Sequence, residues 1–270
     1  MHLNGYAHAV LPFDAPVVVV AHSCVCSWYR AVRGDVPDTV PLQTYRQRVA
    51  AGLDAADEVV APTAAMMAAL LREYGPLPRA SVVWNGRSRA PFASGPKLPV
   101  VFAAGRVWDD AKNLRLLAQV APRLGWPVRI AGPLTDDRGF EHAVMLGRLP
   151  GPAVAQELAH ASIYALPARY EPFGLSALEA AFAGCALVLG DIPSLRELWD
   201  GDALFVAPDD PDGLERALCT LMNDAPLRTT FGRKAAARAS RYTMDGMVAG
   251  YLARYAALPS RREDRARCAS

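Results

Sequence analysis

The feature that most constrains the fold is a regular alternation of short apolar, often β-branched runs with longer segments rich in Ala, Leu and Arg. Strands that alternate with helices form parallel sheets with helices on both faces. The expected strands are 16–21, 58–61, 81–84, 100–104, 128–131, 144–146, 162–166, 186–189 and 203–206. The expected helices are 43–55, 64–74, 111–124, 152–161, 175–183, 211–223, 226–240 and 244–258. The sequence therefore predicts an α/β protein.

A break in this alternation divides the chain. Residues 85–99 contain five Gly and Pro residues and little apolar periodicity, which is typical of an interdomain linker. We expect two Rossmann-like lobes whose parallel sheets face a cleft, with 1–95 as the first lobe and linker and 96–258 as the second. The charged segment 259–270 is expected to be a disordered tail.

Composition excludes several classes of protein. A net charge of +2 over 270 residues does not indicate a nucleic-acid partner, since such proteins usually carry a strongly basic stripe. The five cysteines are odd in number and scattered, which favours buried free thiols in a reducing compartment. The first fifteen residues do not resemble a signal peptide, and the longest apolar run, 15–21, is too short to span a bilayer. We expect a cytoplasmic protein, and peripheral association with a membrane stays compatible with the sequence.

The loop after the expected strand 100–104 carries two cations. Ligands of open α/β sheets bind at the carboxyl ends of the strands, and there Gly105 allows the chain to turn while Arg106 and Lys112 follow. If Lys112 lies at the start of the helix 111–124, the two cations and the helix N-terminus form a clamp for a diphosphate. The alternative is an exposed Arg and Lys on a loop.

Two carboxylates follow the expected strand 162–166. Glu171 lies in a loop shaped by Pro172 and Gly174, and Glu179 falls inside an otherwise apolar helix. A carboxylate in such surroundings is costly unless it accepts hydrogen bonds, and paired ribose hydroxyls are suitable donors. Glu171 could accept from a sugar hydroxyl. The alternative is a helix-capping Glu171 and a salt-bridged Glu179.

These strings resemble a known family. Glu171-Pro-Phe-Gly-Leu175 with Leu178-Glu-Ala180 and Gly184-Cys-Ala-Leu-Val188 resembles the E-x7-E signature of family-4 retaining glycosyltransferases, the group 1 glycosyl transferases of GT-B fold. Further similar segments are Gly105-Arg106 with Lys112-Asn113, Ile130-Ala-Gly132, Met145-Leu-Gly-Arg-Leu149 and Asp191-Ile-Pro-Ser-Leu-Arg-Glu197. Because five motifs occur in order between about residues 100 and 258, the resemblance is specific.

The resemblance implies roles for these residues. Arg106 and Lys112 would bind the donor diphosphate, Glu179 the ribose, and Glu171 the transferred sugar, so that 96–258 is a nucleotide-sugar-binding lobe. The implied donor-binding residues are Gly105, Gly132, Arg148, Phe173, Gly174, Leu175 and Glu179, with amides of 173–175 at the sugar and Gly132 and Arg148 near the base. The resemblance also implies that neither a metal nor another cofactor is needed, in agreement with the lack of metal-ligand spacing.

The first lobe matches the family less fully. Val19-Val-Ala-His-Ser23 resembles the strand end that supplies a histidine to the cleft, which makes His22 a catalytic candidate at the sugar or the β-phosphate. The alternative is a structural histidine at a strand end. The family's opening strands and glycine-rich loop are not found before Met1-His-Leu-Asn-Gly5, which resembles an internal strand, so we expect an incomplete acceptor-side lobe.

The resulting hypothesis is a retaining, metal-independent glycosyltransferase. It would move a sugar from a nucleoside-diphosphate sugar to a hydroxyl of an unidentified acceptor, which could be a saccharide, a lipid or a small molecule. One alternative is a shortened, non-catalytic protein that binds a nucleotide sugar. A sugar epimerase of similar fold is the other, although the string from Glu171 to Glu179 argues against it.

Overall fold

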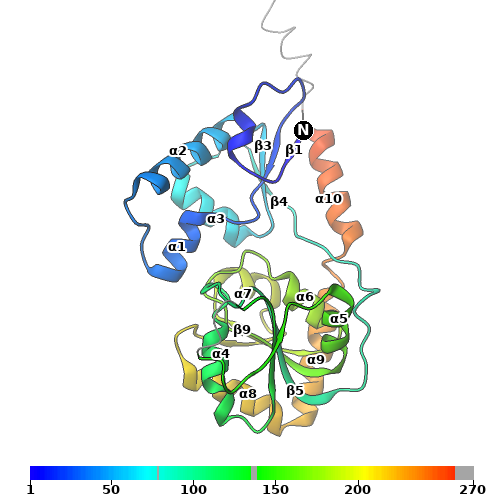
Figure 1. Ribbon diagram of the computed structural model, residues 1–270. Coiled ribbons are helices and arrows are strands. Elements are labelled where there is room, and N and C mark those ends of the chain that lie inside the picture. Colours follow the sequence, from blue (N-terminus) through cyan, green and yellow to red (C-terminus); the bar gives the residue numbers. More distant parts are fainter. Residues whose placement is uncertain (78, 135–138, 259–270) are drawn as a thin grey trace, which may run out of the picture. The chain divides into compact units, whose positions relative to one another are not determined.

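The chain folds into two compact units. The computed structural model describes residues 1–77, 79–134 and 139–258, so the expected tail 259–270 lies outside the described residues. One unit consists of Met1–Asn85 and the segment that begins at Asp245, and the other is Gly86–Met244 (Figure 1). Each unit is built on a parallel sheet. The predicted α/β fold with two Rossmann-like parallel sheets is confirmed.

The sheet of the C-terminal unit has six strands within the described residues, in the order β10-β9-β8-β5-β6-β7. All the pairs are parallel. The strands are β5 (Leu98–Ala104), β6 (Val128–Ala131), β7 (Val144–Gly147), β8 (Ala161–Leu166), β9 (Ala186–Gly190) and β10 (Leu204–Val206). The order places β5 and β8 side by side at the centre, so the loops that follow these two strands meet at one edge.

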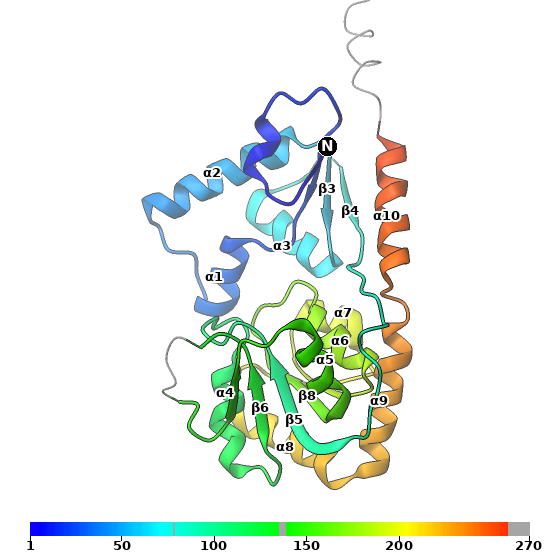
Figure 2. The same cartoon turned by 45° about the vertical axis from the view of Figure 1, so that its right-hand side comes forward.

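Helices cover both faces of this sheet (Figures 1 and 2). Alternate strand residues point to opposite faces, so Phe102 and Tyr164 join one apolar core while Val101 and Ile163 join the other. The first core includes side chains of α5 (Gly151–His160), α6 (Leu175–Phe182), α7 (Pro193–Trp199) and α9 (Ala225–Ala239). The second includes side chains of α4 (Leu114–Val120), η2 (Ala121–Arg123) and α8 (Pro211–Asn223).

The N-terminal unit has a four-stranded parallel sheet within the described residues, in the order β1-β2-β3-β4. Its strands are β1 (His2–Leu3), β2 (Val18–Val20), β3 (Glu58–Ala61) and β4 (Ala80–Val82). Its helices are η1 (Ala7–Val10), α1 (Val25–Arg33), α2 (Val40–Ala55), α3 (Ala64–Tyr74) and α10 (Met244–Ala257). Thr63 caps α3, because its side chain accepts a hydrogen bond from the backbone N of Met66 at 3.0 Å.

The two units do not coincide with the predicted ranges 1–95 and 96–258. Residues 86–95 group with the C-terminal unit, and nearly all of α10 groups with the N-terminal unit. Met247 and Tyr251 of α10 pack against the cluster formed by Val18, Val20, Val60 and Val83, and Figure 2 shows α10 beside β4. The long-range packing of α10 therefore makes the N-terminal unit discontinuous in sequence.

The helix predicted for 111–124 is shorter in the structure. Helix α4 begins at Leu114, because Asn113 has a left-handed backbone (φ 57°) and its side chain donates to Pro167 O at 2.9 Å and to Pro208 O at 2.7 Å. A 3-10 turn replaces the last helical turn at Ala121–Arg123. Lys112 consequently lies in the turn before the helix and not in its first turn.

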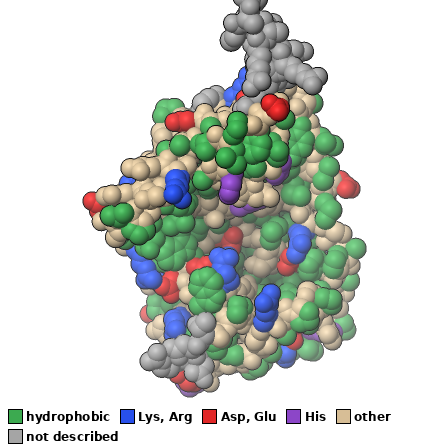
Figure 3. All heavy atoms as spheres, turned by 45° about the horizontal axis from the view of Figure 1, so that its top comes forward, with side chains coloured by type: hydrophobic (Ala, Val, Ile, Leu, Met, Phe, Trp, Pro, Cys, Tyr) green, Lys and Arg blue, Asp and Glu red, His purple; other side chains and the backbone are tan. Residues whose placement is uncertain are grey.

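The surface in Figure 3 carries Lys and Arg side chains singly, with Asp and Glu side chains between them. This pattern differs from the continuous basic stripe of nucleic-acid-binding surfaces. Among the helices of the described part of the chain, none has both the length and the apolar character that a membrane crossing requires.

Candidate active site

Glycines line the carboxyl edge of the C-terminal sheet at the ends of three neighbouring strands. The N–H of Gly105 donates to Ala131 O at 3.0 Å, and the N–H of Gly132 donates to Gly147 O at 2.8 Å. A Cβ atom at Gly132 would lie 1.8 Å from Gly105 O, so the close approach of these two backbone segments requires glycine at position 132. The edge consequently presents backbone without side chains, and a polar ligand can come close to it.

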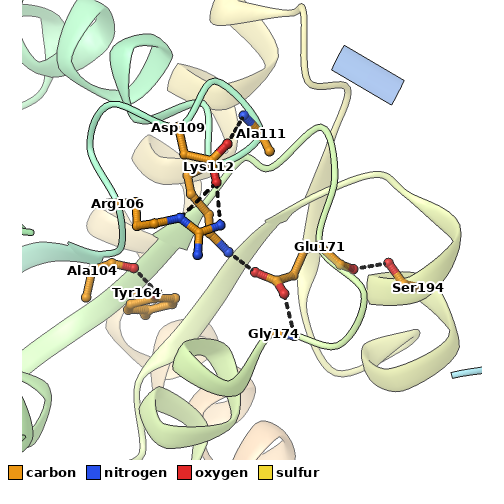
Figure 4. Close-up of polar contacts among 9 residues, drawn as sticks. All are labelled: Ala104, Arg106, Asp109, Ala111, Lys112, Tyr164, Glu171, Gly174 and Ser194. Carbon is orange, nitrogen blue, oxygen red and sulfur yellow. Dashed lines mark hydrogen bonds and ion pairs between the residues drawn. The ribbon is translucent and has the colours of Figure 1, made fainter. Parts of the chain in front are cut away.

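Arg106 is oriented by a carboxylate in its own loop. Its Nε and Nη2 atoms donate to Oδ2 of Asp109 at 3.1 and 2.6 Å, and Oδ1 of Asp109 accepts from Ala111 N at 3.0 Å (Figure 4). The Arg106 side chain is 59% exposed while that of Asp109 is 4% exposed. Asp109 thus anchors the loop from within and leaves most of the guanidinium accessible. Asp109 is not among the residues predicted from the sequence, although its position three residues after Arg106 is a signal for such a pair.

Lys112 and Glu171 are brought together from the loops after β5 and β8. The backbone N of Arg169 donates to Ala111 O at 2.9 Å and ties the two loops to each other. Lys112 Nζ then donates to Glu171 Oε2, with the two side chains only 16% and 11% exposed (Figure 4). Glu171 Oε1 accepts from Gly174 N at 3.0 Å. Glu171 therefore makes the helix-capping contact that the sequence left as an alternative. It also holds Lys112, one of the two cations predicted to bind the diphosphate.

The loop before α6 explains which of the three predicted amide positions are accessible. Gly174 is the N-cap residue of α6 with φ 88°, a backbone conformation that favours glycine. Its N–H already donates to Glu171. The Phe173 ring is buried and meets the Tyr242 ring edge-on with centroids 5.7 Å apart, so only the backbone of Phe173 can serve a ligand. Leu175, the first residue of α6, is 38% exposed.

Glu179 is held by an arginine that the sequence analysis did not single out. Arg87 Nε donates to Glu179 Oε1 at 2.7 Å, and Arg87 Nη2 lies 2.6 Å from the same oxygen. The Arg87 side chain is 48% exposed and that of Glu179 is 11% exposed. Among the described residues, Oε2 of Glu179 makes no hydrogen bond, so this oxygen can still accept from a ligand hydroxyl. Arg87 is 92 positions away in sequence and gave no local signal.

Tyr164 lies beneath this edge and was also missed, because an apolar strand gives no sign of a polar role. Its hydroxyl donates to Ala104 O at 3.3 Å (Figure 4). Burial raises the pKa of Tyr164, and the carboxylates of Glu171 and Glu179 raise the pKa further, against an opposing hydrogen bond with Ser176. The neutral hydroxyl therefore serves as a fixed hydrogen-bond donor to the end of β5.

The remaining candidates are His22 and Arg148. His22 follows β2 in the N-terminal unit, and its Nε2 lies 2.9 Å from Asn4 Oδ1. Since an amide oxygen only accepts, Nε2 carries the proton. Two effects lower the pKa of His22, namely desolvation of the ring and the nearby His2. The lowered pKa favours the neutral imidazole, although part of the side chain is exposed. Arg148 is exposed directly after Gly147 at the end of β7, and the neighbouring strand β6 is followed by Gly132. The roles of both residues stay predictions.

Within the described residues, no group of three or more His, Cys, Asp or Glu side chains could hold a metal ion. The expected independence of metals stays a prediction, since only a measurement of activity can test it. What the geometry does provide is two arginine–carboxylate pairs and one lysine–carboxylate pair around a glycine-lined edge, with Arg106 and Arg87 partly open to solvent.

Comparison with known proteins relates this unit to one family. Residues 98–224 match the family described as glycosyl transferases group 1. The phosphatidyl-myo-inositol mannosyltransferase of Mycolicibacterium smegmatis is 31% identical over 180 residues, which are 58% of this chain. The chain spans 47% of that protein's length.

Solved structures extend the likeness in fold to most of the chain. Sucrose-phosphate synthase from Thermosynechococcus elongatus matches with a TM-score of 0.77 and 18% identity, over 91% of this chain and 68% of that one. Anabaena HepE in complex with UDP and glucose matches with a TM-score of 0.74 and 16% identity, over 90% and 72%. The chain thus has a GT-B-like α/β fold, and its residues 98–224 are related in sequence to the group 1 glycosyl transferases.

Proposed function

We propose that the protein is a glycosyltransferase that moves a sugar from a nucleoside-diphosphate sugar to an acceptor hydroxyl. The observation that carries this proposal is the cluster of Arg106, Lys112, Glu171 and Glu179 at one glycine-lined edge of the C-terminal sheet. The match of residues 98–224 to a glycosyl transferase family supports it. The fold shared with Anabaena HepE, which was solved with UDP and glucose, supports a nucleotide sugar as the donor.

The cations stabilise the group that leaves. Negative charge accumulates on the diphosphate as the bond to the sugar's anomeric carbon breaks, and fixed cations near that charge lower the barrier. Of the two cations proposed to bind the diphosphate, Lys112 is the one paired with Glu171. Binding of a diphosphate would let Lys112 exchange this carboxylate partner for phosphate oxygens. The freed Glu171 Oε2 could then accept from a sugar hydroxyl. Arg106 can make the same exchange, because 59% of its side chain is exposed and Asp109 is fixed independently by Ala111 N.

Glu179 can bind ribose without giving up Arg87. Both contacts of Arg87 are made to Oε1, so Oε2 is the oxygen that would accept from a ribose hydroxyl. Arg87 directs the Glu179 carboxylate, and a charged acceptor makes a stronger hydrogen bond than a neutral one. The predicted ribose contact and the salt bridge are therefore compatible.

Two finer parts of the proposal rest on the resemblance of the string from Glu171 to Glu179. These are retention of anomeric configuration and activity without a bound metal. Both are accessible to one assay, in which the configuration of the product is read by NMR and the rate is compared with and without EDTA.

The test of the proposal is calorimetric titration with UDP, GDP and ADP and with their common sugar conjugates. We expect binding of one base in EDTA, weakened by Glu179→Gln and by Arg106→Ala. The matched control is Arg216→Ala, which removes an arginine that is 70% exposed on α8 and pairs with Asp210. Lack of binding to every nucleotide would overturn the proposal. Binding without transfer to any saccharide, lipid or small-molecule acceptor would identify a nucleotide-sugar-binding protein instead.

A further inference from the structure

A cavity of about 360 Å³ lies within the C-terminal unit, away from the candidate active site. Lys97 directly precedes β5, Ser162 is the second residue of β8, and Gly184 lies two residues before β9. The cavity therefore sits at the amino ends of these parallel strands, whereas Gly105 and Glu171 follow the carboxyl ends of β5 and β8. The six residues of β8 separate the two edges by roughly 17 Å at about 3.3 Å per residue.

The lining of this cavity is strongly positive. Of its eleven residues, four are Lys or Arg and none is Asp or Glu. Arg89 and Arg233 are exposed, and among the described residues neither guanidinium takes part in a hydrogen bond or ion pair. Most other arginines of this unit have a carboxylate partner, as Arg106 and Arg196 do. Positive charge that the protein does not neutralise is thus concentrated in one hollow.

The other two cations are fixed by the protein. Lys97 Nζ donates to Leu158 O at 3.0 Å, and burial lowers its pKa against the opposing effect of the Cys185 thiol. Arg228 donates to Leu221 O at 2.7 Å, and its guanidinium lies 4.8 Å from the centre of the Trp126 ring. These two side chains contribute positive charge without being free to move toward a ligand.

Backbone packing gives the cavity a defined floor. A Cβ atom at Gly232 of α9 would lie 2.6 Å from Gly184 O, so α9 approaches the chain closely here because position 232 lacks a side chain. Gly184 has φ 77°, and a Cβ atom there would lie 3.3 Å from Ser94 Oγ. Ser94, Ser162 and Thr229 also line the cavity. The hydroxyls of Ser162 and Thr229 donate to Leu98 O at 2.6 Å and to Ala225 O at 2.8 Å, so of these three hydroxyls that of Ser94 is the one that can donate to a ligand.

We propose that this cavity binds a phosphate monoester, with Arg89 and Arg233 as the side chains that contact it. Guanidinium groups match the spacing of phosphate oxygens and bind them in pairs. The cavity has the volume of a small-ligand site, which leaves room for a small organic group beside the phosphate. The site lies at the other edge of the sheet, so it stands independently of the proposed sugar transfer.

The test uses the whole chain with the same phosphate group in two forms. Glycerol 3-phosphate presents it in solution, and vesicles of phosphatidylcholine with phosphatidic acid present it on a lipid surface, with vesicles of phosphatidylcholine alone as the blank. Calorimetry is done with and without a saturating concentration of whichever of UDP, GDP and ADP binds the protein, so that the proposed donor site is filled. Arg89→Ala with Arg233→Ala is expected to weaken binding about tenfold or more. Lys234→Ala is the matched control, because it removes a neighbouring cation of α9 that is outside the lining.

Each outcome decides the proposal. Binding that is lost in the double variant and kept in Lys234→Ala and Arg106→Ala supports it, and the form that binds identifies the free or the lipid source. Binding that this nucleotide displaces, or that is lost in Arg106→Ala alone, places the phosphate at the proposed donor edge and overturns the proposal. Absence of binding to both forms, or equal binding by the double variant with unchanged circular dichroism, overturns it as well.

Discussion

Alanine substitution of Gly105 and of Gly132 at the carboxyl edge distinguishes a ligand-binding role from a structural one, because each substitution adds a single methyl group. A Cβ atom at Gly132 would lie 1.8 Å from Gly105 O, with φ 154°, whereas a Cβ atom at Gly105 would meet nothing closer than Lys112 Cγ at 3.5 Å. Contacts of Cβ below 3.0 Å are essentially not observed, so Gly132→Ala requires a backbone shift of at least 1.2 Å (3.0 minus 1.8). Overpacking and backbone strain together cost about 2–6 kcal/mol.

Gly105→Ala has the opposite expectation. Its methyl group fits the structure in ordinary contact, so the free energy of unfolding should change by less than about 1 kcal/mol. The same methyl group would stand where the proposed donor diphosphate would approach the backbone, and we expect affinity for the nucleotide to fall about tenfold or more.

Urea unfolding followed by circular dichroism measures the first quantity, and calorimetry with the nucleotide that binds measures the second. A Gly132→Ala protein as stable as the original would refute the geometric reasoning. A Gly105→Ala protein that binds the nucleotide normally would show that no ligand approaches this backbone.

Three further predictions use the same measurements. Lys112→Met leaves the nearly buried Glu171 carboxylate without its cation and should lower the free energy of unfolding by about 2–4 kcal/mol. Adding Glu171→Gln to this variant should restore a large part of the lost stability, whereas additive effects of the two substitutions would contradict direct coupling between the two side chains. Arg87→Met should cost about 1–2 kcal/mol and weaken nucleotide binding through Glu179, while unchanged affinity would separate Glu179 from the ligand. The lowered pKa of His22 means that the unfolded chain binds a proton more readily than the folded chain does. The contribution of His22 to the free energy of unfolding is therefore full above the ordinary pKa of 6.5 and is lost as the pH decreases below it. His22→Gln should reduce the fall of the urea midpoint between pH 7.5 and 5, and an unchanged fall would rule His22 out as its source.

Local sequence signals predicted much of the fold. Helix α3 runs from Ala64 to Tyr74 as predicted, because Thr63 caps its start and Gly75-Pro76 ends it. Helix α1 had a signal that went unused, since apolar residues at 25, 28, 29 and 32 follow helical spacing. The start of α4 was placed too early because the left-handed Asn113 is held by Pro167 and Pro208, which are distant in sequence. The partner of α10 was likewise unpredictable, since an apolar helix face does not say which sheet it covers.

The candidate site was predictable as a set of residues and not as a set of contacts. Motif order and strand ends brought Arg106, Lys112 and Glu171 to the same edge, as the structure has them. The sequence could not show that Lys112 pairs with Glu171, because side-chain pairing depends on the register of β5 against β8 and on the loop bonds between them. Arg87 lies in the segment 85–99, whose Gly and Pro content indicated a connection between two lobes and gave no sign of a binding residue.

The discontinuity of the N-terminal unit has a consequence for the order of biosynthesis. The strands of its sheet leave the ribosome before the C-terminal unit, but α10, which packs on Val18, Val60 and Val83, is made only after the 159 residues of Gly86–Met244. Until then the valine cluster of this sheet lacks the cover that Met247 and Tyr251 of α10 provide. Of the two sheets, the one that is synthesised earlier is therefore completed later, and the C-terminal unit, continuous in sequence, can finish folding before it.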